Sequence, residues 1–467
     1  MRTGHPLARV AVAAGLLLAH APAATAQLRP PLSEAAKTVD REAVRHLLSQ
    51  NANVNATEGD GSTALHWAAY RDDVDTADRL LKAGAKVNVA NDLGATPLWA
   101  AALNGSEAMT RRLLQAGADP NLALTSGETP LMAASRSGAP AVVTQLLAKG
   151  AKLDAFGPRG QTALMWAVAQ KHPDVTRLLI AAGADIHRKS APLNQVMAVS
   201  PHGMLQYNKD VPFGGDTALM FAARVGDTES ARLLLAAGAH PGDTDAWGVS
   251  ATAMAAHAGF TDIVELLLDK GADPNTSGGG FTPLHAAVMR RDERMVAALL
   301  AHKADPNAKV LSWTPTRRSS RDWNFNPELV GATPYWLAAR VTAPSIMTLL
   351  LDHGADPTVV HHAVYHGGDP IVERSQTTTP LTAALGMGGG VPWVSIDTTE
   401  REALALACVQ IAVAHGAEVN LANDDGRTAL DAAKRLQYQS VVAFLTAHGA
   451  TAGASNRPAS RGSATNR

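Results

Sequence analysis

Three histidines and an aspartate near residue 365 form the group best suited to metal chemistry. The stretch VVHHAVYHGGDP holds His361, His362, His366 and Asp369, and zinc is commonly bound by imidazole nitrogens together with a carboxylate. His362 and His366 are four residues apart, a spacing that would place both on one face of a helix. No Glu lies between them, so the helical metalloprotease motif is absent, and the Gly and Pro residues that follow disfavour a long helix. A zinc site and a solvated His-rich loop both stay open as interpretations.

A second stretch, KVLSWTPTRRSSRDWNFNPELV, mixes aromatic and basic residues. It contains Trp313, Arg317, Arg318, Arg321 and Trp323. Trp and Arg are the residue types most enriched where protein interfaces gain their affinity. These five side chains are therefore candidates for binding an anionic peptide, a glycan or another anionic partner. In the alternative interpretation the loop folds back, and both Trp side chains fill gaps in a hydrophobic core.

The stretch GSTALHWAAY, which begins at Gly61, could serve catalysis, ligand stacking or packing. It returns 33 residues later as GATPLWAAAL and recurs along the chain. The position of His66 carries a second histidine, His285, but Trp, Met, Ala, Thr or Asp in the other copies. A catalytic histidine would not be replaced in most copies, so we predict structural roles for both. For Trp67 and Trp166, which share another repeat position, half-buried packing is favoured over a ligand platform.

The remaining reactive residues predict no enzyme active site and no cofactor. Cys408, the only cysteine, lies in the apolar stretch ALALACVQIAV and is interpreted as a buried small residue. The run Gly388–Gly390 lacks the Lys and Ser/Thr of a phosphate-binding loop, so we interpret it as a flexible turn. No GxSxG, CxxC or haem-attachment motif is present.

The elements that must position these residues repeat with a period of about 33 residues. In each unit a Thr or Ser precedes a short apolar helical run and can cap its exposed amides, which is worth about 1 kcal/mol. A second, Leu-rich helix follows and ends at a Gly suited to a left-handed C-cap. An extended segment, here called the finger, leads into the next unit. Asn51 and Lys303 replace the terminating Gly in two units, and Lys303 should cost on the order of 1 kcal/mol.

These units resemble the ankyrin repeat family. The resemblance is carried by the pattern G-x-T-P/A-L-H-x-A-A and by the ending LL-x-x-G-A-D-P-N, seen at residues 113–121 and 267–275, and it covers residues 30–450. It implies an all-α solenoid of about eleven stacked helix-turn-helix units, with β-turn fingers that can carry small β-hairpins. It also implies that the His of the T-P-L-H motif hydrogen-bonds within and between repeats.

The period breaks at four insertions, which we place near residues 187–214, 308–330, 358–376 and 386–400. The first three leave from fingers, and the fourth separates two helices of one unit. Insertions in repeat proteins map to loops on one face, which is often the binding face. Trp247, at a finger tip in TDAWG, is a further candidate for binding a partner.

The ends of the chain predict export. Residues 1–26 combine two Arg, a short apolar run and Ala24-Thr25-Ala26, the pattern of a cleaved signal peptide. Removing them changes the formal net charge from −1 to −3, so no basic excess points to nucleic acid. The Ala-, Gly- and Arg-rich composition favours a bacterial source. We expect a periplasmic or extracellular protein with an array over residues 27–450 and a disordered tail over 451–467.

Together these patterns predict a non-catalytic scaffold that binds another protein through its concave face, finger tips and inserted loops. We expect a monomer that is not inserted in a membrane. The alternatives are a metal-dependent or enzymatic site built from the insertions, and a scaffold that binds a glycan.

Overall fold

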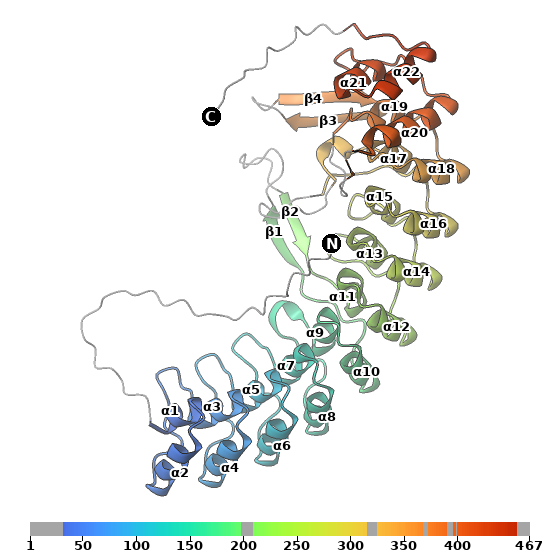
Figure 1. Cartoon of the computed structure of the whole chain (residues 1–467). Coiled ribbons are helices and arrows are strands. Elements are labelled where there is room, and N and C mark those ends of the chain that lie inside the picture. Colours follow the sequence, from blue (N-terminus) through green and yellow to red (C-terminus); the bar gives the residue numbers. More distant parts are fainter. Residues whose placement is uncertain are drawn as a thin grey trace, which may run out of the picture.

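The chain forms a curved, two-layered stack of helices (Figure 1). The computed structural model describes residues 31–197, 209–314, 325–367, 372–389, 396–397 and 399–454. Successive helices form pairs, and each pair contacts the next through both of its helices. The first helices of the pairs lie on the inner side of the curve and the second helices on the outer side.

After α1, every inner helix begins one residue after a Thr or Ser in extended conformation, as the capping pattern predicts. At α5, for example, the Thr96 hydroxyl accepts a hydrogen bond from the Trp99 amide at 3.2 Å. The inner helices are α1 (Pro31–Lys37), α3 (Ala64–Tyr70), α5 (Pro97–Leu103), α7 (Pro130–Ser137), α9 (Ala163–Ala169), α11 (Ala218–Val225), α13 (Ala251–Ala258), α15 (Pro283–Met289), α17 (Pro334–Arg340), α19 (Pro380–Ala384) and α21 (Ala429–Leu436).

The outer helices end at residues in the left-handed conformation. Gly117 follows α6 with φ 87°, and Asn51 and Lys303 adopt the same conformation with φ 57° and 68°. The outer helices are α2 (Arg41–Ser49), α4 (Val74–Lys82), α6 (Glu107–Gln115), α8 (Pro140–Ala148), α10 (Pro173–Ala181), α12 (Thr228–Ala236), α14 (Thr261–Asp269), α16 (Glu293–Ala301), α18 (Pro344–Asp352), α20 (Arg401–Ala414) and α22 (Gln439–Ala447).

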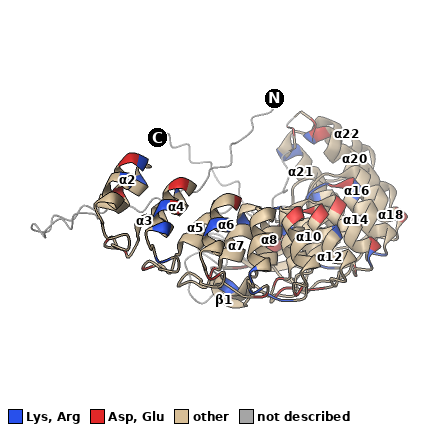
Figure 2. Ribbon diagram, turned by 90° about the horizontal axis from the view of Figure 1, so that it is seen from below, with Lys and Arg blue, Asp and Glu red and all other residues tan. Residues whose placement is uncertain are grey.

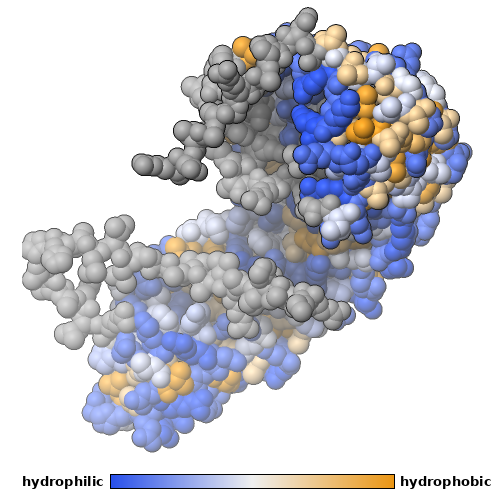
Figure 3. Space-filling model, turned by 45° about the horizontal axis from the view of Figure 1, so that its top comes forward, coloured by the Kyte–Doolittle hydropathy of each residue, from blue (hydrophilic) through white to orange (hydrophobic). Residues whose placement is uncertain are grey.

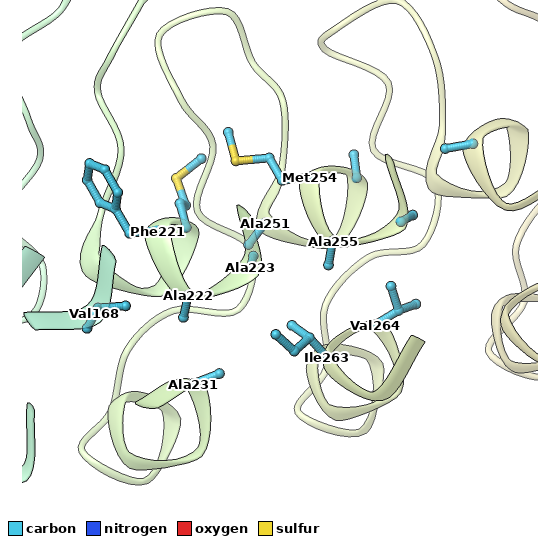
Figure 4. Packing of buried hydrophobic residues seen from close by; sticks show 14 of the residues in the cluster. Val168, Phe221, Ala222, Ala223, Ala231, Ala251, Met254, Ala255, Ile263 and Val264 are labelled. Atoms are coloured by element: carbon cyan, nitrogen blue, oxygen red, sulfur yellow. The ribbon is translucent and has the colours of Figure 1, made fainter. Parts of the chain in front are cut away.

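The core is a continuous layer between the inner and outer helices. Small side chains let the helices approach closely: Ala222 and Ala255 are fully buried and point toward the outer layer (Figure 4). Phe221 and Met254 point the other way, toward the finger side of α11 and α13. In α11 and α13, small alanines therefore face the outer helices, and larger buried side chains face the fingers.

Two insertions form β-hairpins on the inner side of the curve (Figure 1). Strands β1 (Leu193–Met197) and β2 (Lys209–Phe213) pair antiparallel in the first insertion. Strands β3 (His361–Gly367) and β4 (Val372–Thr378) pair antiparallel in the third. The resemblance allowed for hairpins in the fingers, and the structure shows where two of them lie.

The surface is polar and of mixed charge. Lys and Arg are interspersed with Asp and Glu along the array in Figure 2. The face in Figure 3 is mostly hydrophilic, with small and separate hydrophobic areas. Within the described ranges, none of the helices is long and apolar enough to cross a lipid bilayer.

Candidate functional site

The two histidines of the repeat motif join neighbouring units, so their predicted structural role is confirmed. In His66, Nδ1 accepts the Thr63 amide at 3.0 Å, and Nε2 lies 3.0 Å from the Ala95 carbonyl of the next finger. His285 makes the same pair of bonds with Thr282 and Ala308. Burial lowers the pKa of both rings, that of His285 to about 4. Both imidazoles are therefore held neutral inside the array.

Asparagines at the finger bases also join neighbouring units, a role that the sequence interpretation missed. The Asn121 carboxamide donates from Nδ2 to the Gly150 carbonyl at 3.0 Å and accepts the Lys152 amide on Oδ1 at 2.8 Å. The same pair of bonds is made by Asn55, Asn88, Asn275, Asn307 and Asn420. The signal was the Asn that closes the G-A-D-P-N ending, which had served only to identify the repeat.

The three candidate histidine ligands lie on a strand, which corrects the helical spacing considered for them. His361 faces the array, is only 2% exposed, and lies against the Trp336 ring at 4.4 Å with Nε2 bonded to the Val330 carbonyl at 3.0 Å. His362 and His366 are exposed on the opposite face of β3. Every second residue of a strand advances by about 6.7 Å, and His362 and His366 are two such steps apart. Their Cα atoms therefore lie roughly 13 Å apart. The two histidines cannot chelate one ion.

Asp369, the fourth candidate ligand, is outside the described residues. Among the residues that are described, no three His, Cys, Asp or Glu side chains are grouped closely enough to hold a metal ion.

Four of the five residues of the predicted Trp/Arg site also lie outside the described residues: Arg317, Arg318, Arg321 and Trp323. The fifth, Trp313, is described and is half-buried. The base of this loop is closed. The Thr314 amide donates to the Phe325 carbonyl at 2.9 Å, and the Phe325 amide donates to the Thr314 hydroxyl at 2.8 Å.

Phe325 itself is part of the core. Its ring is fully buried, with its centre 4.8 Å from that of Phe281. The alternative in which the second insertion folds back therefore holds at its base, through Phe325. Whether the two Trp side chains also fill gaps in the core stays a prediction, because Trp323 lies outside the described residues.

The first insertion borders a pocket of about 800 Å³ against the inner side of the array. Strands β1 and β2 form one wall, and helix α11 with the fingers on either side forms the rest. The side chains that line it are mostly aromatic, charged or amide-bearing: Arg159, Gln161, Asn194, Gln195, Phe213, Asp216, Phe221, Arg224, Asp245 and Trp247. The first insertion thus contributes one wall of a partly open pocket on the inner side of the array.

Two carboxylates and one guanidinium meet in this pocket. The Arg224 guanidinium pairs with Asp216 Oδ1 at 2.6 Å and lies over the Phe221 ring at 5.5 Å. Asp245 Oδ1 accepts the backbone amides of Trp247 and Val249 at 2.9 and 2.8 Å. Burial raises the pKa of Asp245, and the neighbouring negative charge of Asp216 adds to this effect.

The structure places Trp247, the finger-tip candidate, in the wall of this pocket. Its side chain is half-buried. Within the described residues its indole makes no hydrogen bond, ring contact or cation contact. Sequence reasoning found Trp247 from its place at a finger tip, but it missed Asp216, Arg224 and Asp245.

Comparison with known proteins gives the family. Residues 32–123, 116–190 and 219–310 match the family described as ankyrin repeats (3 copies), and together these matches span more than half of the chain. The chain belongs to the ankyrin repeat family. Ankyrin repeats are generally non-catalytic units that mediate protein–protein interaction.

A solved ankyrin structure is similar to this chain over part of its length. The ankyrin repeat domain of human ASB11 is 27% identical, with a TM-score of 0.42, and the match covers 60% of this chain and 100% of that one. A search of curated proteins found no matching relative.

The inner face of the ankyrin array carries the two tryptophans that share a repeat position. Both are half-buried, as predicted, with a cation over each ring: Lys37 Nζ lies 4.5 Å from Trp67, and the Arg136 guanidinium 5.4 Å from Trp166. Cys408 is fully buried in α20, and burial raises the pKa of its thiol to about 12, which fits the predicted inert packing role.

Proposed function

We propose that this ankyrin chain is a non-catalytic scaffold that binds another protein along the inner side of its curve. The observation that carries the proposal is the pocket beneath the β1–β2 hairpin. Stacking of the repeats does not require the first insertion, yet this insertion forms one wall of a pocket with Trp247 and charged side chains around it. Hot-spot residues of protein interfaces are typically such aromatic and charged groups in partly enclosed positions.

The proposal includes the finer organisation of the chain. It comprises an exported, periplasmic or extracellular protein, with residues 1–26 removed, about eleven units over 27–450 and four insertions, the first of which supplies the binding loop. The charged start and short apolar run support export, and the single Cys408 fits a protein that is stabilised by packing alone. N-terminal sequencing of the exported protein tests the removal of residues 1–26. The proposal requires that the mature chain begins directly after Ala26.

The binding proposal is tested by affinity capture with three versions of the chain. The first is the full chain. The second replaces residues 194–212 with an Asn-Gly turn, which the Leu193–Phe213 pairing allows. The third replaces residues 315–324 with a short Gly/Ser link, which the contacts between Thr314 and Phe325 allow.

We expect a protein partner that is captured by the full chain and by the third version, but lost from the second. Loss from the third version alone would move the binding site to the second insertion. Failure of the full chain to capture any protein, together with retention of a glycan, would contradict protein binding itself.

A further inference from the structure

We infer that the pocket beneath the β1–β2 hairpin binds a Lys or Arg side chain of an extended protein segment. Asp245 would be its ion-pair partner and Trp247 the aromatic surface beside it. This inference rests on the proposed function and names the chemistry of the partner.

The charge of Asp245 is not needed for the turn that contains it. Its Oδ1 accepts the amides two and four residues ahead, at Trp247 and Val249. Asn91 and Asn423 accept the same two amides with their neutral carboxamide oxygens in other fingers. An Asn would therefore serve the turn equally well, without the free-energy cost of burying a negative charge.

The second carboxylate oxygen of Asp245 can accept a hydrogen bond from a ligand. Its Oδ2 has no hydrogen-bond or ion-pair partner within the described residues. The cation that acts on it is Arg224, which is already paired with Asp216 at 2.6 Å. Two carboxylates thus share the Arg224 guanidinium, and Asp245 has no ion-pair partner of its own within the described residues.

An incoming cation would give Asp245 an ion-pair partner and would lie against the Trp247 ring. The ring of Trp247 lines the pocket and has no cation or ring against it in the described residues. Arg224 over Phe221, at 5.5 Å, shows the same kind of cation–ring contact a short distance away. Cation–π contacts and ion pairs both strengthen when they are removed from water.

The other end of the pocket suits the backbone of the partner segment. Arg159 is exposed, and its side chain has no partner in the described residues. Gln161 and Asn194 also line the pocket. These guanidinium and amide donors can bind backbone carbonyls. A pocket of about 800 Å³ has room for one long side chain and part of its backbone.

An anionic or neutral ligand fits this arrangement less well. An anion at Trp247 would meet the two carboxylates, and like charges at close range are unfavourable. A neutral saccharide could stack on Trp247, but it would leave Asp245 without an ion-pair partner. The charges therefore favour a basic peptide.

The test is a binding titration with four synthetic peptide pools. Every peptide is nine residues long, with mixed Ala, Ser and Thr around a fixed central residue. The central residue is Lys in the first pool, Arg in the second, Gln in the third and Glu in the fourth. The pools are titrated against the full chain, Asp245→Asn, Trp247→Leu and Asp92→Asn. Asp92 is an exposed finger residue outside the pocket, so its substitution is the charge-matched control.

We expect the Lys and Arg pools to bind the full chain and Asp92→Asn alike. They should bind Asp245→Asn about tenfold or more weakly, because one partner of a partly buried ion pair is lost. Thermal melting of Asp245→Asn, which we expect to match the full chain, separates loss of binding from loss of fold.

Three other outcomes overturn the inference, and they can be distinguished from one another. Equal binding of all four pools, or equal binding by Asp245→Asn, would reject the basic side chain while leaving a protein-binding scaffold in place. Binding of a neutral oligosaccharide that depends on Trp247, with no binding of any pool, would reject both the inference and the proposed function.

Discussion

At the scale of single residues, repeat position decides the role of a side chain. His66 and His285 look like catalytic candidates one at a time, but both bond to their own capping Thr and to the next finger. Comparison across the repeats was enough to predict this. The same comparison could not predict that Asn121 and its equivalents join neighbouring units through their carboxamides. A recurring Asn in a finger is equally compatible with a turn.

His285 should make stability depend on pH. Its pKa is about 4 in the folded chain and about 6.5 when unfolded, so the unfolded state binds a proton first as the pH falls. Stability is therefore complete above pH 6.5 and is lost as the pH falls toward 4, by up to about 3 kcal/mol. His285→Met, which copies the Met found at matching positions such as Met132, should be less stable at pH 7.5 but should show a flatter pH profile.

Urea unfolding at a series of pH values between 7.5 and 4 checks this prediction. The surface substitution His353→Gln is the control and should keep the full pH dependence. An unchanged slope in His285→Met would assign the acid sensitivity to other groups.

Lys303 holds a left-handed conformation that other repeats give to Gly. Its φ is 68°, and a side chain there costs roughly 1 kcal/mol. Lys303→Gly should therefore raise the free energy of unfolding by about 0.5–1 kcal/mol. Lys270→Gly is the matched control, because Lys270 caps α14 with φ −90° and gains nothing from Gly. Stabilisation by both substitutions, or by neither, would argue against backbone strain at Lys303.

At the scale of elements, the helices were predictable and the insertions were only partly so. The Thr caps, the paired alanines and the terminating Gly residues recur in register, so each helix is specified several times over. The third insertion occurs once, and its histidine spacing fits a helix or a strand alike. The segment forms a strand because β3 pairs with β4. His361 and Thr378, which face each other in this pairing, are 17 residues apart, so the local sequence around either residue does not indicate the pairing.

The second insertion should separate into a dispensable part and a core part. Replacing residues 315–324 with a Gly/Ser link should leave the melting temperature within about 2 °C, because the link closes a loop whose ends already meet. Phe325→Ala should cost about 3–5 kcal/mol, since it empties a fully buried ring position. Differential scanning calorimetry measures the melting temperature of both variants. A comparable loss of stability in the two would place residues 315–324 in the core as well.

At the scale of the whole molecule, the array was predictable and the pocket was not. A period of 33 residues implies stacking, whatever the individual residues are. The pocket joins Arg159, Phe221 and Trp247, which come from separate units and are brought together by the stack and by the first hairpin. Its composition depends on how far that hairpin leans over the inner helices, and neither periodicity nor spacing encodes that angle.

Removal of one whole unit should preserve the stack. Excision of residues 97–129 joins Thr96 to Pro130, which recreates the capping motif, and Asn88 takes the place of Asn121 at the next finger. We expect a folded chain with the same helicity per residue and a lower melting temperature, because one interface between neighbours is lost. Circular dichroism checks this. Excision of residues 97–112, about half a unit, is the control and should abolish cooperative unfolding.

The asparagine bridges bear on how such a chain can diverge. Asn307 bonds to Gly354 and Asp356 across the whole second insertion, with the same geometry that Asn121 uses across an uninterrupted unit. The array therefore keeps its register whatever length of chain lies between. Because the entropy of closing a loop grows only with the logarithm of its length, longer loops cost little. Mutation can thus rewrite what the protein recognises while the framework that holds the loops is inherited unchanged.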